Sequence, residues 1–225
     1  MTDGPSPLAV AQLRTPRSAA VAGIIFALLQ GTSYVLVRLS IPADPAAAGD
    51  WLESRRSTVT LALALVPFAG IAFLWFIGVV RDRIGDLEDR FFSSVFFGSG
   101  LLFLAMTFVA AALAGGMLST YADQSVQMVE SGLYRFSRDT MYRVANVYAI
   151  RMAAVFMISL GTIWVRTRTM PRPLIVATYA AALVLMISIS FSLWVSLLFP
   201  GWVLAISVYI LFGNVRRQAP APSPS

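Results

Sequence analysis

The chain of 225 residues has no cysteine, no histidine and no lysine, and these absences exclude several kinds of chemistry. Without cysteine there is no disulfide and no thiol nucleophile, and without histidine there is no Cys/His zinc site and no histidine-ligated haem. A Ser-His-Asp triad is excluded for the same reason. Because cysteine is absent, the redox compartment cannot be read from its usage. We therefore expect no enzymatic activity and no bound metal or other cofactor.

Charge is also scarce in this chain. Only 12% of the residues are charged, whereas 58% are hydrophobic. A soluble domain is typically about 25% charged and about 45–50% apolar, so this chain has too little polar surface to cover a globule in water. A lipid bilayer removes that requirement, because side chains that face lipid can be apolar. The composition therefore predicts an integral membrane protein in contact with the lipid bilayer.

All 17 basic residues are arginine, and with 11 acidic residues they give a net charge of +6. The arginines cluster at the ends of apolar runs, which is typical of topology signals in membrane proteins. We therefore expect no nucleic-acid partner. Arginine without lysine, together with abundant alanine, is also typical of a GC-rich bacterial genome, which favours a bacterial plasma membrane as the location.

Six apolar runs predict an all-α bundle of six transmembrane helices. A helix needs roughly 20 residues to cross about 30 Å of hydrocarbon. The predicted spans are about 18–37, 58–80, 91–115, 145–165, 173–191 and 194–213. They form one domain, residues 18–213, between a cytoplasmic tail of residues 1–17 and a disordered cytoplasmic tail of residues 214–225.

Two of these spans depend on arguments from length. The first run resembles a signal peptide, because residues 46–48 form a small-residue Ala-Ala-Ala site, but it exceeds the usual h-region of about 7–15 residues. We therefore expect a retained helix. The run 173–213 would measure about 61 Å as one helix, so we expect two helices with a turn around Ser192 to Trp194. Pro200 is then expected to kink the sixth helix.

The distribution of arginine predicts the orientation of the bundle. With six spans, ten arginines fall in the short segments on the side of the two termini, and six fall in the longer segments on the other side. Arginine in short loops favours the cytoplasmic side. The sequence therefore predicts that both termini face the cytoplasm, and that residues 38–57 and 116–144 lie outside.

The segment 116–144 is the longest polar connection, and apolar residues are interleaved along it. Such a pattern predicts a short amphipathic helix at the membrane interface. Ser137 is expected to cap a helix that continues into the fourth span, with Asp139 in its first turn, where a negative charge is favourable.

Arg151 lies inside the fourth predicted span, about 22 Å from the cytoplasmic end that Arg166 marks. One interpretation is a site for an anionic group, either a lipid headgroup or a substrate carboxylate. Arg143 and Arg138, on the same side, are further candidates for such a site. The other interpretation is an arginine that extends toward the outer interface or bonds to a neighbouring helix. The sequence assigns no catalytic, cofactor-binding or metal-binding residue.

Small and polar residues within the predicted spans leave two functions open. Ala19 with Gly23, and Ser94 with Gly98, have the spacing that lets membrane helices pack closely. The alternative is a polar path for a small transporter or channel, working as a homo-oligomer. No Asp or Glu lies in a predicted span, which argues against ion-coupled transport. We therefore favour an accessory protein that binds a protein partner or lipid through its outer connections.

Five short segments carry a resemblance to a known group of proteins. They are residues 139–143, 147–152, 166–168, 171–172 and 199–203. Together they resemble bacterial multi-pass membrane proteins of unknown function, over roughly residues 60–213. The resemblance implies a six-helix architecture and a bacterial plasma membrane, and it implies no activity.

Overall fold

The computed structural model describes residues 7–40, 54–84, 90–187 and 193–217, and every regular element among them is a helix. In chain order these are α1 (Pro7–Ser40), α3 (Arg56–Ile84), α4 (Arg90–Glu130), α5 (Leu133–Arg143), the π-helix η2 (Val144–Ala149), α6 (Ile150–Thr167), α7 (Arg172–Ile187), the 3-10 helix η3 (Leu193–Leu197) and α8 (Leu198–Arg217). The predicted all-α fold is therefore confirmed for the described residues.

Among the described residues, five helical segments are long and apolar enough to cross a membrane. They are Ser18–Ser40, Arg56–Arg81, Phe91–Asp123, Leu133–Thr167 and Trp194–Phe212. Helix α7 is also apolar but has only 16 residues. These helices agree with the prediction of a multi-pass membrane protein.

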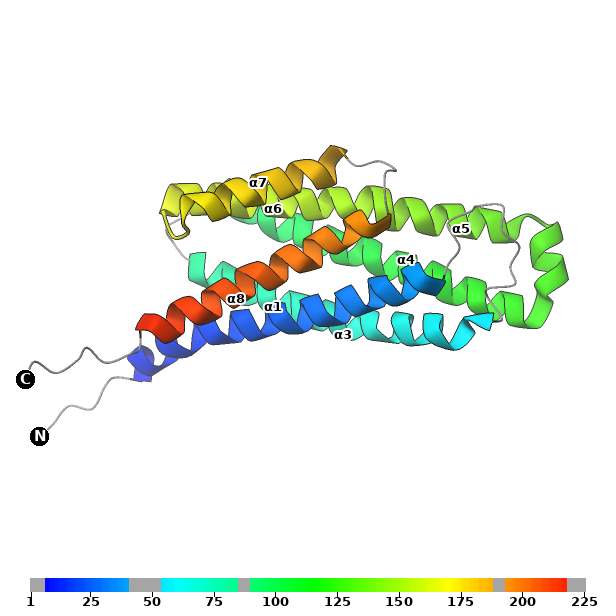
Figure 1. Cartoon of the computed structure of the whole chain (residues 1–225), viewed down its shortest axis with the longest axis horizontal. Coiled ribbons are helices and arrows are strands. Elements are labelled where there is room, and N and C mark those ends of the chain that lie inside the picture. Colours follow the sequence, from blue (N-terminus) through cyan, green and yellow to red (C-terminus); the bar gives the residue numbers. More distant parts are fainter. Residues whose placement is uncertain (1–6, 41–53, 85–89, 188–192, 218–225) are drawn as a thin grey trace, which may run out of the picture.

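The long helices run side by side in one bundle (Figure 1). Helix α1 packs against α3 and α8. Helix α6 packs against both α4 and α7. Helix α1 begins and α8 ends at the same end of the bundle, whereas α5 lies at the opposite end (Figure 1). We call the first of these the terminal end of the bundle and the second its far end.

Two helices extend into segments predicted as tails. Helix α1 begins at Pro7, within the predicted tail 1–17, because proline is favoured at the first helical position, where its missing N–H is not needed. Helix α8 continues to Arg217, beyond the start of the predicted disordered tail. Residues 218–225 of that tail lie outside the described residues, as do residues 41–53 of the predicted outer loop.

The predicted interfacial segment 116–144 is largely a continuation of the bundle helices. Helix α4 runs on to Glu130, and Gly132 then turns the chain into α5 with a φ of 73°. A left-handed φ costs glycine little, which suits this residue to the turn. The prediction that Ser137 caps a helix was wrong, because α5 begins at Leu133 and Ser137 lies inside it. Helix α5, η2 and α6 follow one another along one line, so α5 does not lie across the end of the bundle (Figure 1).

The start of α8 corrects one expectation about proline. Pro200 is the third residue of α8, not a kink in its middle. The first N–H groups of a helix have no partner within it, so proline is tolerated there without loss of a hydrogen bond. Of the predicted turn, Ser192 lies outside the described residues, and Trp194 lies in η3.

Aromatic rings fill the centre of the bundle. The Phe73 ring of α3 lies 4.5 Å from Phe26, 5.5 Å from Phe103, 5.4 Å from Phe156 and 5.7 Å from Phe199, measured between ring centroids. These rings come from α1, α4, α6 and α8, and all of them are buried. Most of the pairs are tilted or edge-to-face, which is a favourable arrangement for aromatic rings. The five helices therefore share one closed aromatic core.

Small residues permit close approach at two helix crossings. A Cβ added to Gly23 would overlap the Ser207 hydroxyl of α8, so the predicted contact of the Ala19 and Gly23 face is confirmed. A Cβ on Gly98 would meet nothing within 4 Å, whereas one on Gly100 would lie 2.6 Å from Ile77 Cδ1. The packing glycine of α4 is therefore Gly100, and the expectation for Gly98 was wrong.

One buried hydrogen bond joins α7 to α8. Trp202 Nε1 donates to Thr178 Oγ1 at 3.0 Å, and both side chains are buried. Changing Thr178→Val keeps the shape but leaves the indole N–H unpaired, so we expect unfolding in detergent to cost about 1–2 kcal/mol less. In a Trp202→Phe background, which lacks the donor, Thr178→Val should lower the free energy of unfolding by clearly less than it does in the unchanged chain. Equal costs in both backgrounds would assign the effect to packing alone.

Two arginines anchor neighbouring helices to the start of α4. The guanidinium carbon of Arg81 lies 4.9 Å from the centroid of the Phe97 ring, and that of Arg166 lies 4.5 Å from Phe92. Cation–π contacts of this kind favour a charged group beside an aromatic face. They tie α3 and α6 to α4 at the terminal end of the bundle.

Candidate functional site

Helix α4 is too long to lie entirely within a bilayer. Its 41 residues would measure about 61 Å, whereas the hydrocarbon layer is about 30 Å thick. Polar residues become frequent after Leu118, and the membrane-crossing segment ends at Asp123, so the last turns of α4 extend beyond it. We call residues 116–143, which comprise this part of α4, the turn at Gly132 and α5, the helical projection.

The helical projection has a small hydrophobic core of its own. It consists of Val59, Met117, Leu118, Met128 and Tyr134, with Leu63 and Tyr121 packed against it. Two of these residues come from the beginning of α3, so the projection is fixed to a second helix as well as to itself. Helix α5 is consequently held along α4 and is not a free surface helix.

One face of α5 is apolar and exposed. Leu133, Phe136, Thr140 and Arg143 follow each other at spacings of three, four and three residues, which places them on the same side of a helix. Phe136 is 68% exposed, and Leu133 and Arg143 are also exposed. A large exposed aromatic side chain beside a cation is typical of an interaction site. We call these four residues the α5 face.

The three arginines predicted as an anion or lipid headgroup site lie in different surroundings. Arg138 is only 8% exposed and already interacts with other groups of the protein. Arg143 is exposed at the end of α5, on the α5 face. Arg151 is half-buried at the start of α6, where its Nη1 donates a hydrogen bond to the Val147 carbonyl at 2.8 Å. The structure thus places them along one helical path without bringing them into one site.

The π-helix η2 separates the helical projection from the membrane part of α6. Its wider turns are uncommon and often occur at functional positions. Two side chains bond to backbone carbonyls here: Asn146 Nδ2 donates to Tyr142, 3.2 Å away, and Arg151 donates to Val147 as described. The intrahelical bond gives Arg151 a partner that neither sequence interpretation included.

A second polar group lies inside the bundle, between α1 and α4. The Tyr34 hydroxyl hydrogen-bonds to the side chains of Gln30 and Thr107, and Ser33 Oγ donates to the Ala62 carbonyl at 2.9 Å. Gln30 is 1% exposed, and its Nε2 has no hydrogen-bond partner. The polar run in the sequence pointed to Gln30 and Ser33, but Thr107 is distant in sequence and could not be linked to them.

Within the part of the chain that the structure describes, no group of three acidic side chains lies close enough to hold a metal ion. The α5 face and the polar group around Tyr34 are the candidate sites, and the interactions they offer are apolar contact and hydrogen bonds. Comparisons with known proteins add nothing to this geometry: no protein-family model, no curated protein and no solved structure matches the chain.

Proposed function

We propose that the chain is a six-span protein of a bacterial plasma membrane that works without enzymatic activity, as a binding partner for another protein. The observation that carries this proposal is the α5 face on the helical projection. At 68% exposure, Phe136 is the most exposed aromatic side chain among the described residues. Phe136 lies near the far end of the segment Leu133–Thr167, whose 35 residues exceed the roughly 20 that cross the hydrocarbon. The proposal places this ring beyond the lipid, where exposing it to water is unfavourable unless a partner covers it.

The six spans and their orientation rest on two features. Helix α7, an apolar helix of 16 residues that follows α6 and precedes α8, supplies a sixth crossing beside the five long segments. An even number of crossings agrees with α1 beginning and α8 ending at the same end of the bundle (Figure 1). Arg81 and Arg166 lie at that end too, and arginine in short segments favours the cytoplasm. The helical projection then lies outside the cell membrane.

The chemistry of the α5 face specifies the kind of partner. Phe136 and Leu133 offer an apolar centre, and Arg143 offers a guanidinium at its edge. Aromatic and arginine side chains carry a large share of the binding energy at protein interfaces. The complementary surface is an apolar pocket with a carboxylate at its rim, on a protein that is also held at the outer side of the membrane.

The test is site-specific crosslinking in the native membrane. A photoreactive amino acid in place of Phe136 is expected to yield one stoichiometric crosslinked protein, identified by mass spectrometry. The same amino acid in place of Phe68, which is 63% exposed within a membrane-crossing segment, should crosslink lipid instead. Phe136→Ala should weaken association with the identified partner at least about tenfold. If position 136 gives no protein crosslink, or Phe136→Ala leaves association unchanged, the proposal is wrong.

Solute transport by a homo-oligomer is the second candidate function. The buried polar group of Gln30, Tyr34 and Thr107 favours it, because such groups can line a path through a bundle. The closed aromatic core around Phe73 and Phe199 argues against it, since the rings fill the centre at which the helices meet. Solute flux into liposomes that contain the purified protein would favour transport over partner binding.

A further inference from the structure

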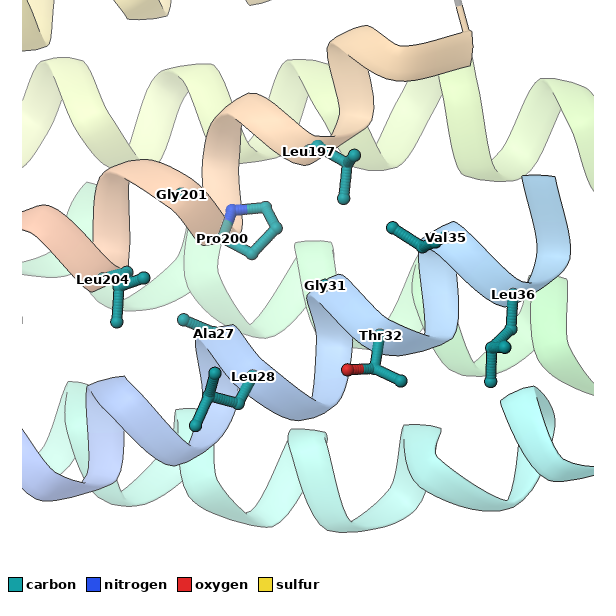
Figure 2. A pocket seen from close by; sticks show the side chains of 10 residues that line it. All are labelled: Ala27, Leu28, Gly31, Thr32, Val35, Leu36, Leu197, Pro200, Gly201 and Leu204. Carbon is teal, nitrogen blue, oxygen red and sulfur yellow. The ribbon is translucent and has the colours of Figure 1, made fainter. Parts of the chain in front are cut away.

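A groove runs along the surface between α1 and α8 (Figure 2). Its volume is about 380 Å³, and Thr32 is the one polar residue in its lining. Its lining includes Ala27, Gly31 and Val35 of α1, Leu197 of η3, and Pro200 and Gly201 of α8. All of them belong to segments that are apolar enough to cross a membrane, so the groove faces lipid rather than water.

The packing of the protein does not account for the two glycines of the groove. A Cβ added to Gly31 or to Gly201 would meet nothing within 4 Å, whereas one added to Gly23, earlier on α1, would overlap α8. Glycine inside a helix costs about 0.5–1 kcal/mol relative to alanine. Both glycines line the groove, so the open space beside them can be filled by a molecule that does not belong to this chain.

A positive charge lies at one end of the same face of α1. Arg38 follows Gly31 by seven residues and Val35 by three, so the three residues share one side of the helix. It lies about 10 Å beyond Gly31 along the axis, in the last turn of α1, where the membrane-crossing segment ends. Its Nε is buried and has no hydrogen-bond partner among the described residues.

We propose that this groove and Arg38 bind one anionic phospholipid molecule. An acyl chain lies over Gly31 and Gly201, and the phosphate accepts hydrogen bonds from the guanidinium of Arg38. The charges are complementary, and hydrogen bonds between arginine and phosphate are among the strong ones. The site is on the flank of the bundle, away from the α5 face, and does not depend on the proposed partner.

A helix of a second copy fits the groove less well than a lipid. Copies in one membrane are related by an axis along its normal, so a symmetric contact at the groove would bring two Arg38 side chains together at the same depth. Like charges in an apolar setting repel each other strongly. A phospholipid brings the opposite charge at the depth where Arg38 lies.

The test is native mass spectrometry of the full chain in detergent, titrated with phosphatidylglycerol. One lipid should bind well before any others. Arg38→Gln should weaken this first binding step about tenfold, which is what loss of a charged hydrogen bond costs. Gly31→Leu should abolish the step, because leucine fills the groove. The control Gly78→Leu on α3, where an added Cβ also meets nothing, should leave it unchanged.

Diacylglycerol, which has the same acyl chains and no phosphate, separates the two halves of the site. It should bind about tenfold more weakly than phosphatidylglycerol and should not respond to Arg38→Gln. The proposal is overturned if no first binding step stands out, or if Arg38→Gln and Gly31→Leu both bind phosphatidylglycerol like the unchanged chain. It is also overturned if Gly31→Leu turns a dimer into a monomer while lipid binding persists, because the occupant is then a second copy.

Discussion

Replacing Phe73 by alanine is expected to lower the free energy of unfolding by about 3–5 kcal/mol, the range for removal of a fully buried phenylalanine. The side chain is 0% exposed and contacts rings from four other helices. These rings also contact one another, so none can move into the space without losing a contact elsewhere. A cavity therefore remains. Reversible unfolding of the detergent-solubilised protein, followed by helical circular dichroism, measures the loss.

The matched control for this experiment is Phe68→Ala on the same helix. Phe68 is 63% exposed, so its truncation removes contacts with lipid or detergent and leaves no internal cavity. We expect a change within about 0.5 kcal/mol, as for substitutions away from packed sites. A similar loss for both variants would mean that the aromatic core is not what holds α3 in the bundle.

Replacing Gly100 by valine is expected to lower the free energy of unfolding by about 3 kcal/mol, at the upper end of the range for overpacked cores. A Cβ alone would lie 2.6 Å from Ile77 Cδ1 and 3.1 Å from Phe156 Cδ2, and valine adds two methyl groups to it. Both neighbours are buried and cannot move into solvent. Helix α4 must therefore shift away from α3 or α6.

Gly98→Val, two residues away on the same helix, is the control for Gly100→Val. An added Cβ there meets nothing within 4 Å, so no neighbouring helix has to move. Its stability should match that of the unchanged chain within about 0.5 kcal/mol. If Gly98→Val proves as destabilising as Gly100→Val, valine itself rather than overpacking is the cause.

The helical fold could be predicted because it depends on local composition. Each apolar run is long enough to form a helix without information from the rest of the chain. The continuation of α4 through residues 116–130 could not be predicted in this way, because that stretch contains polar residues. It is stabilised by packing of Met117 and Leu118 against Val59 of α3, a contact between distant segments. Gly132, which ends this stretch, is one of several glycines that local sequence does not distinguish.

The candidate site was predicted only in part. The sequence indicates which arginines lie at the far end of the bundle, but it does not separate buried Arg138 from exposed Arg143, because their orientation depends on packing against α4. Phe136 has the same difficulty, since an aromatic in an amphipathic helix usually faces inward. The spacing of Gly31 and Arg38 can be read from the sequence. That Gly31 borders a groove depends on the position of α8, which no local sequence pattern predicts.

The π-helix η2 determines the direction in which the α5 face points. Successive residues of an α-helix are 100° apart around its axis, and a π turn takes up one more residue per turn than an ordinary one. If the same residues formed a regular α-helix between Val144 and Ala149, the extra residue would change the azimuth of everything before it by about 100°. Phe136 would then point in another direction than it does now. A one-residue deletion that closes η2 into regular α-helix should therefore keep the direction of the α5 face, whereas an α-helix of unchanged length should not.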